Sequence, residues 1–409
     1  MASTSMSRGA RASVNLLILL LGAAVFLNYV DRGAIGIAAP KMKDELGLSA
    51  ETYGLAFSAF FWIYAPVQFF AGWLCDRFSV YRMMALGILF WSAATLLMGF
   101  AGGFLSLLAL RVMLGVGESI SFPGSSKIIA RHVPPERRGI ANAAVATGIA
   151  LGPAVGTLVG GLILGSLGWR WIFFTFGAVT LFWLLPWRQA IRDLPTTGHF
   201  DQGTRVPLGK LMGKWSLWAM SFGHALNNYS FYFLLAWIPL FLTKSRGFSI
   251  AEMTLLATIG YSVQGACALG CGHFSDWWTC SGRSEAACRR YMMIASQALP
   301  ALAILGLAFA RSPFEIALLL SLAGVGSAFG STNLYAVAQI FAGPRAAGTW
   351  VGFQNALGNV SGIIGPIITG IVVQRAGYHS AFILTAAVAA FGAFWWALAV
   401  PRIEQAALD

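Results

Sequence analysis

The chain has 409 residues, of which 57% are hydrophobic and only 10% are charged, and it contains 47 glycines. This composition excludes a water-soluble globular domain, in which roughly a quarter of the residues are charged. The formal net charge of +12 is spread over short loops between apolar runs, so it does not form the basic patch that a nucleic-acid partner requires. The sequence predicts an all-α membrane protein that crosses the lipid bilayer many times.

Apolar runs recur along the whole chain, and each can cross a hydrocarbon core that requires roughly 20 helical residues. The first run follows Arg8 and Arg11 and begins like a signal peptide, with basic residues before an apolar stretch. It continues to Pro40, however, and that length favours a first transmembrane helix. We expect twelve transmembrane helices: 14–39, 51–74, 82–101, 103–131, 137–164, 169–190, 215–243, 250–276, 290–310, 313–342, 346–373 and 378–401.

Lysine and arginine residues are concentrated at the termini and in the loops after the even-numbered spans. Arg137 and Arg138 follow the fourth span, and Arg188 and Arg192 follow the sixth. Because basic loops stay on the cytoplasmic side, this distribution predicts cytoplasmic termini for a multi-pass protein of the cell inner membrane.

The longest polar segment, residues 191–214, carries prolines and basic residues, and we interpret it as a cytoplasmic linker loop. It separates an N-terminal six-helix bundle, residues 1–190, from a C-terminal six-helix bundle, residues 215–409.

The two halves resemble each other in sequence. GWLCD at residues 72–76 recurs as GHFSD at residues 272–276, in each case at the end of the second helix of its half. LGWRWIFF after the fifth span likewise matches AGYHSAFI after the eleventh. A duplicated six-helix unit is typical of transporters whose binding site lies between the halves near the membrane midplane.

Nothing in the polar segments suggests an enzyme or a metal site. No serine, histidine and acid combination stands out, and the loops are too short for a catalytic or signalling domain. The five cysteines lack metal or redox spacing, so we expect packing residues or free thiols. They are Cys75, Cys267, Cys271, Cys280 and Cys288.

Four ionisable residues stand out because they lie deep inside the predicted spans rather than at their ends: Asp31, Arg32, Arg111 and Glu118. A charge at the bilayer centre costs roughly 2.5–3.5 kcal/mol, so such residues are functional candidates by default. Asp31 and Arg32 are neighbours and point about 100° apart on a helix, so each needs another partner. Arg111 and Glu118 are seven residues apart and share one face of the fourth span. We expect the four side chains to face one nearly neutral cavity.

Each of these groups has a chemistry that suits transport. Arginine stays protonated and offers a fork of donors to a carboxylate, so Arg32 or Arg111 can hold an anionic substrate. Removal from water disfavours the charged form of a carboxyl group, so Glu118 and Asp31 can take up and release protons. The alternative is that these residues form two structural ion pairs that lock the helices together.

The two six-helix halves, the central basic loop and GWLCDRFSVYR after the second span resemble the major facilitator superfamily across the whole chain. The loop departs from the family pattern at Ser79, where glycine is usual, and at Tyr81, where a basic residue is usual. The resemblance implies that Asp76 and Arg77 act in a cytoplasmic gate; alternatively, they are charges that only fix the topology.

NYVDR in the first span, with RVMLGVGES and SFPG in the fourth, resembles the anion:cation symporter family within that superfamily. This family includes permeases for sugar acids and aromatic acids and carriers of sialic acid and glutamate. The resemblance implies a monomer that needs no cofactor beyond protons as the coupling ion. It assigns the substrate carboxylate to Arg32, the proton sites to Asp31 and Glu118, and communication with Glu118 to Arg111. It also places substrate contacts at Tyr64, Asn355 and Asn359.

The seventh span is unusually polar. Asn228 and Tyr232 lie one turn apart on one face, so we expect them to complete the cavity from the second half. Gln264 in the eighth span is a further candidate ligand contact, whereas we expect His224 to lie near a helix end.

Two other functions remain open at this point. The fifth span carries Gly139, Gly148, Gly152, Pro153 and Gly156, which approaches the signature of proton-coupled drug or metabolite exporters. The same small residues also let helices pack closely. A non-transporting membrane sensor or enzyme is the remaining alternative.

Overall fold

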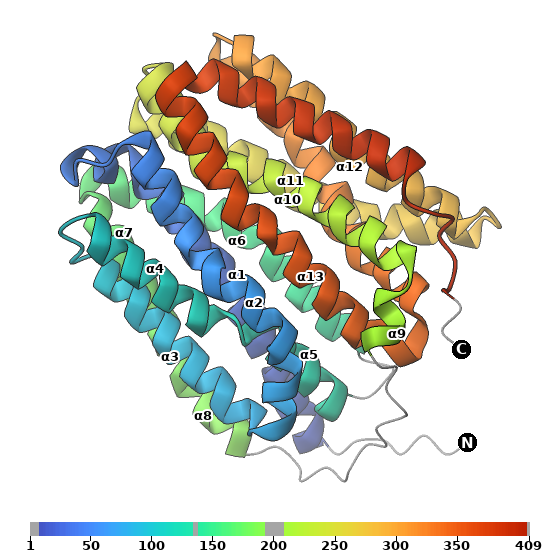
Figure 1. Ribbon diagram of the computed structural model, residues 1–409. Coiled ribbons are helices and arrows are strands. Elements are labelled where there is room, and N and C mark those ends of the chain that lie inside the picture. Colours follow the sequence, from blue (N-terminus) through green and yellow to red (C-terminus); the bar gives the residue numbers. More distant parts are fainter. Residues whose placement is uncertain (1–7, 134–137, 193–207, 407–409) are drawn as a thin grey trace, which may run out of the picture.

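The computed structural model describes residues 8–133, 138–192 and 208–406, and these form helices joined by short turns, with no strand among them (Figure 1). The helices of the first half are α1 (Arg8–Glu45), α2 (Ala50–Arg77), α3 (Val80–Met98), α4 (Phe104–Glu118), α5 (Ser121–His132), α6 (Arg138–Ser166), α7 (Trp169–Phe182) and α8 (Leu184–Arg192). Those of the second half are α9 (Leu208–Met212), α10 (Trp215–Leu240) with the π-helical turn η2 (Phe241–Ser245), α11 (Ile250–Cys280), α12 (Glu285–Phe309) and α13 (Pro313–Leu398).

The expected twelve-span architecture is confirmed. Ten stretches of the described residues are long and apolar enough to cross a membrane, and the last of them, Thr349–Leu398, contains two helices. The 28-residue helix α2 supplies the remaining span. The 86-residue α13 is interrupted at Gly343 (φ 62°) and Gly377 (φ 79°), which divide it into three spans. Glycine adopts such positive φ angles without a steric penalty.

The internal repeat is also visible in the backbone. Gly168, in the LGWRWIFF segment, has φ 96°, and Gly377, in the matching AGYHSAFI segment, has φ 79°. Both glycines precede the last spanning helix of their half. The two halves therefore start this helix with the same kind of turn.

The fourth span is broken directly after Glu118, where α4 ends and α5 begins at Ser121. Pro123 explains the break, since a proline has no N–H and cannot bond the carbonyl four residues before it. That carbonyl belongs to Ser119, and it accepts instead from Nε2 of Gln68 in α2 at 3.4 Å. The proline thus frees a backbone group that ties α2 to the position beside Glu118.

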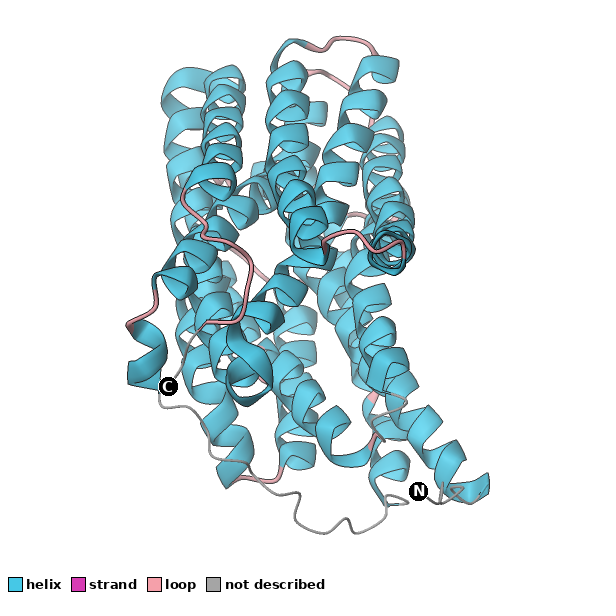
Figure 2. Ribbon diagram, turned by 90° about the vertical axis from the view of Figure 1, so that its right-hand side faces the viewer, coloured by secondary structure: helices cyan, strands magenta, loops and turns pink. Residues whose placement is uncertain are grey.

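Helix α1 begins and α13 ends toward the same end of the molecule (Figures 1 and 2). We call the opposite end the distal end; it includes the C-terminal part of α1 and the start of α2. Most of the predicted linker, residues 191–214, lies outside the described residues, so the domain boundaries stay a prediction.

The two halves are joined at the distal end. The Tyr53 hydroxyl in α2 donates to the Ala236 carbonyl in α10 at 3.0 Å. The Ala50 N–H donates to Oε1 of Gln374 in α13 at 3.1 Å, and Asp44 forms an ion pair with Lys244. These contacts close the molecule at this end.

Glycines permit the close approach of the halves. A Cβ on Gly36 in α1 would overlap the Leu235 carbonyl oxygen of α10, and one on Gly54 in α2 would overlap the Pro366 carbonyl oxygen of α13. At Gly33, one turn before Gly36, an added Cβ would lie 3.7 Å from a Leu235 methyl, which is ordinary contact.

We therefore expect Gly36→Ala to open the distal end and Gly33→Ala to leave it closed. Overpacking of this kind costs roughly 1–3 kcal/mol, which shifts a two-state equilibrium about 5- to 150-fold. Spin labels on the exposed positions Glu51 and Ala251, at the starts of α2 and α11, report the separation of the halves. Equal distance distributions for Gly36→Ala and Gly33→Ala would contradict the closing role of Gly36.

Candidate functional site

The centre of the site is a buried ion pair between α1 and α4. Nη2 of Arg32 donates to Oε2 of Glu118 at 2.8 Å, and Nε of Arg32 lies 3.3 Å from the same oxygen. The Arg32 side chain is 3% exposed and that of Glu118 is fully buried. Nη2 also donates to Oδ1 of Asn28, one turn earlier in α1, at 3.2 Å. The pair accounts for two of the four membrane charges.

Aromatic rings surround the Arg32 guanidinium. Its central carbon lies 5.1 Å from the ring centre of Tyr29, 4.9 Å from that of Phe60 and 4.8 Å from that of Tyr64. Such cation–π contacts stabilise a cation by about 0.5–2 kcal/mol each without using its N–H groups. The hydrogen bonds that Arg32 makes with described residues come from Nε and Nη2.

Asp31 does not join this pair. Its Oδ2 accepts from the indole N–H of Trp91 in α3 at 2.6 Å and from the hydroxyl of Thr180 in α7 at 2.9 Å. Oδ1 is buried and has no hydrogen-bond partner among the described residues. The expectation that all four charges face one cavity is therefore wrong, because the 100° step between neighbours on α1 turns Asp31 toward α3 and α7.

In the described part of the chain, Arg111 likewise forms no ion pair with Glu118. Its Nη2 donates to the Phe57 carbonyl at 2.9 Å, and its guanidinium lies 5.2 Å from the Phe57 ring and 5.1 Å from the Phe60 ring. Nε and Nη1 are buried without a partner in the described part of the chain. The two-turn spacing places both residues on one face of α4, but neither reaches the other. The substrate-binding and communicating roles of Arg111 stay predictions.

The second half contributes a connected polar network. The Tyr232 hydroxyl in α10 donates to Oδ1 of Asn359 at 2.6 Å. Nδ2 of Asn359 donates to the backbone carbonyl and to Oδ1 of Asn355, at 2.7 and 3.2 Å, and the Tyr335 hydroxyl lies 3.3 Å from the same Oδ1. Three of the predicted contacts are thereby brought together.

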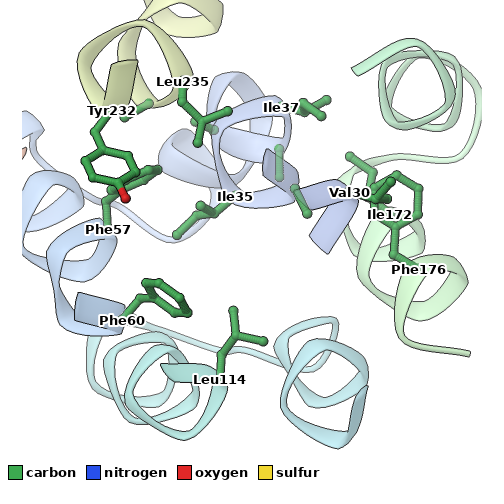
Figure 3. Close-up of a cluster of buried hydrophobic side chains, with 14 of the residues drawn as sticks. Val30, Ile35, Ile37, Phe57, Phe60, Leu114, Ile172, Phe176, Tyr232 and Leu235 are labelled. Carbon is green, nitrogen blue, oxygen red and sulfur yellow. The ribbon is translucent and has the colours of Figure 1, made fainter. Parts of the chain in front are cut away.

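This network lies close to the Arg32 pair. The Tyr232 ring is centred 4.5 Å from that of Phe61, whose own centroid is 6.3 Å from that of Tyr64 beneath Arg32. The close-up in Figure 3 shows the Tyr232 ring next to Phe57, so α10 faces α2 at this level. A small molecule held by Arg32 would therefore be in reach of both halves.

The structure does not bring every predicted contact to the residues around Arg32 and Tyr232. Nδ2 of Asn228 donates to the Gly358 carbonyl at 3.1 Å, so this amide ties α10 to α13. Gln264 lines a separate pocket between α10, α11 and α13, together with Tyr261 and Ser327. The roles of Asn228 and Gln264 as substrate contacts stay predictions.

His224 was expected near a helix end, and this is wrong. It is the tenth residue of α10 and only 3% exposed, with Nδ1 3.5 Å from Nε2 of Gln354. Its ring packs on the backbone of Gly358, where an added Cβ would overlap it. A histidine buried this way fixes the distance between α10 and α13.

The gating prediction falls on residues whose side chains the structure does not describe. Asp76 and Arg77 lie at the end of α2, and their side chains are outside the described part of the chain. The departure at Tyr81 has a structural counterpart, because its hydroxyl is hydrogen-bonded to Nε2 of His132 at the end of α5. Burial, reinforced by the positive charge of Arg131, lowers the pKa of His132. This contact links α3 to α5.

The glycines of the fifth span have a packing role. A Cβ on Gly148 would lie 2.8 Å from the Gly22 carbonyl oxygen, and one on Gly152 would lie 2.6 Å from Cβ of Tyr29. Gly156 similarly lies against Val30. The small residues thus let α6 approach α1, which carries Asp31 and Arg32, and this explains the pattern without an export function.

Sequence reasoning missed several residues of the site. Asn28 and Tyr29 could have been found, because residues three and four positions before Arg32 share its helix face. Trp91, Thr180 and Tyr335 carried no signal, since a tryptophan, a threonine or a tyrosine in an apolar helix is ordinary.

Comparison with known proteins identifies the architecture. The chain matches the sequence model of the Major Facilitator Superfamily over residues 21–284 and 220–408. Its fold is similar to the crystal structure of a bacterial homologue of the human lysosomal transporter Spinster in an inward-facing, unoccupied conformation. The TM-score is 0.80 at 20% identity, covering 97% of this chain and 98% of the other.

Several curated relatives have names that specify an acid. The D-galactonate transporter of Escherichia coli O6:H1 is 26% identical, with 95% of this chain and 96% of the relative covered. The hexuronate transporter of Bacillus subtilis is 28% identical, with 91% and 92% covered. A probable sulfoacetate transporter of Cupriavidus necator is 29% identical, with 90% and 89% covered.

The buried pair makes a prediction about stability. Removing one partner of such a pair costs about 3–5 kcal/mol, whereas replacing both by apolar residues is often neutral. We expect Glu118→Leu to lower the thermal unfolding temperature in detergent, and the double variant Arg32→Met with Glu118→Leu to recover most of the loss. Additive losses in the double variant would contradict a direct interaction between the two side chains.

Proposed function

We propose that this chain, which belongs to the major facilitator superfamily, is a proton-coupled symporter that imports a small organic carboxylate such as a sugar acid or an aromatic acid. Alternating access of a chamber between the two halves carries out the transport. Protons are the coupling ion, no other cofactor takes part, and the chain works as a monomer in the cell inner membrane.

The ion pair of Arg32 with Glu118 is the observation that carries this proposal. With Glu118 ionised, Oε2 of Glu118 occupies two N–H groups of Arg32. A substrate carboxylate needs the same donors, since guanidinium binds carboxylates through a fork of two N–H groups. Protonation of Glu118 weakens the pair and frees the fork for the substrate. Proton binding and substrate binding then favour each other, as linkage of two sites requires.

The chamber offers neutral groups for the rest of the substrate. Tyr64 lies under the Arg32 guanidinium, and Tyr232, Asn355 and Asn359 form the network of the opposite half. Their hydroxyl and amide groups can exchange hydrogen bonds with a substrate as readily as with one another. Binding would therefore draw the two halves together around the ligand, which is the movement that alternating access needs.

The closed distal end agrees with an importer in its resting state, closed to the outside. The basic loops predict that the termini are cytoplasmic, so the distal end faces outward and the structure is closed to the outside. Asp44 with Lys244, and Tyr53 with Ala236, then form the outer gate. Relatives named for D-galactonate, hexuronate and sulfoacetate support an organic anion as substrate.

Uptake of labelled sugar acids and aromatic acids into proteoliposomes, with an acidic outside, tests the proposal. We expect one acid to accumulate and the accumulation to collapse with a protonophore. Glu118→Gln should keep exchange of internal for external substrate and lose accumulation at least 10-fold, because an amide cannot carry the proton. Glu285→Gln, which alters the ion pair with Arg289 outside the chamber, is the matched control. Efflux of a cationic dye without uptake of any acid would instead indicate an exporter.

The role of Arg32 has a separate test. Arg32→Lys keeps the charge but loses the bidentate fork, so we expect exchange to require at least 10-fold more substrate. Arg289→Lys is the control for the same substitution in the second half. Unchanged substrate affinity in Arg32→Lys would contradict the assignment of the carboxylate to Arg32.

A further inference from the structure

We propose that Trp91 and Thr180 are positioning residues for a second coupling proton, which binds to Asp31 rather than to Glu118. They hold one oxygen of Asp31 and leave the other oxygen to take up the proton. This place is separate from the Arg32 pair. This inference rests on the proposed function, because it concerns how that transport couples to protons. The inference adds Trp91 of α3 and Thr180 of α7, which are not among the residues that contact Arg32.

The geometry around Asp31 is asymmetric. Both hydrogen bonds, from Trp91 Nε1 at 2.6 Å and from Thr180 Oγ1 at 2.9 Å, end on Oδ2. Oδ1 is buried with no partner among the described residues. Asp31 and Trp91 are each 1% exposed, and Thr180 is fully buried. One oxygen is thus fully occupied and the other is left for a proton.

Apolar side chains adjoin this site on α1 and α7. Figure 3 shows Val30, its neighbour on α1, directed toward Ile172 and Phe176 of α7. Glu118 on α4 is the titratable group within electrostatic range of Asp31, while Arg32 on α1 itself is turned to Glu118 and Asn28. From α6, Gly156 packs against Val30. Asp31 therefore has no cation in contact within the described part of the chain.

The two neutral donors consequently act on the protonation of Asp31. Hydrogen bonds to an ionised carboxylate favour the ionised form. Among the described residues, an ionised Asp31 has Trp91 and Thr180 as its hydrogen-bond donors, and protonation of Oδ1 removes the charge without disturbing Oδ2. Without one of these bonds the proton stays on Asp31 to a higher pH. The energy of a hydrogen bond to a charged group corresponds to about one pH unit or more.

The separation of the two acids has a consequence for coupling. Asp31 and Arg32 are neighbours on α1, yet they contact α3 and α7 on one side and α4 on the other. A rotation or shift of α1 would therefore change both environments at once. We infer that α1 is the mechanical link between the proton at Asp31 and the substrate at Arg32.

Two variants test the positioning role, each with a matched control. Thr180→Val removes the hydroxyl with almost no change of shape, and Thr95→Val removes a buried α3 hydroxyl that has no partner among the described residues. Trp91→Phe removes the indole N–H. Its control, Trp396→Phe in the second half, removes a buried indole N–H for which the described part of the chain offers no partner. Thr180→Val alone suffices if Trp91→Phe does not fold.

The first readout is an infrared pH titration of the full chain in proteoliposomes. The carbonyl stretch of protonated Asp31 is identified as the infrared band that disappears in the variant Asp31→Asn. We expect its midpoint to move up by about one pH unit in Thr180→Val and Trp91→Phe and to stay in place in both controls. An unmoved midpoint in folded Thr180→Val, or the absence of such a titrating band, would overturn the proposal.

The second readout is transport. Substrate exchange, which needs no proton release, should extend to a pH about one unit higher in both test variants, and gradient-driven uptake should slow several-fold. If the midpoint moves as expected but the unmodified protein shows no proton-driven uptake of any acid, the positioning role stands and the proposed function is wrong. If the unmodified protein couples normally and the midpoint does not move, the positioning role is wrong and the proposed function stands.

Discussion

The site depends on one interaction, the buried ion pair of Arg32 and Glu118. Two charges removed from water are tolerated only when their geometry satisfies them, and here two N–H groups share one carboxylate oxygen. Oδ1 of Asn28 and the rings of Tyr29, Phe60 and Tyr64 supply further contacts of the cation. Oε1 of Glu118 has no hydrogen-bond partner among the described residues, and our proposal is that such a pair exchanges one partner for a substrate.

Helix α1 connects this pair to the rest of the molecule. It faces α4 through Arg32, α3 and α7 through Asp31, and α10 through Gly33 and Gly36. The glycines of α6 bring that helix against the same segment. One helix therefore carries Asp31, Arg32 and part of the distal closure.

The fold could be read from the sequence to a large extent. Apolar length, short basic loops and the matching segments around Gly168 and Gly377 depend on local composition, and the structure agrees with them. Arg32 and Glu118 could also be singled out, since charges deep within apolar spans are rare, and the structure pairs them. These are properties of depth and periodicity, which a sequence contains directly.

The partners of each charge could not be read in the same way. Depth places Asp31 and Arg111 near Glu118, but the direction of a side chain around its helix depends on how the helices are rotated in the bundle. Asp31 therefore meets Trp91 and Thr180, and Arg111 meets the Phe57 carbonyl. His224 was misplaced for a related reason, since its burial comes from the approach of α13 at Gly358.

The most direct test of the account is a count of the protons taken up when substrate binds. Calorimetry of the purified chain with the acid found in uptake experiments, repeated in buffers of different ionisation enthalpy, gives this count without any transport. Competition of the substrate with Glu118 for Arg32 predicts proton uptake near neutral pH that is reduced or absent in Glu118→Gln. Tight binding with no proton uptake, or the same uptake in Glu118→Gln, would contradict it.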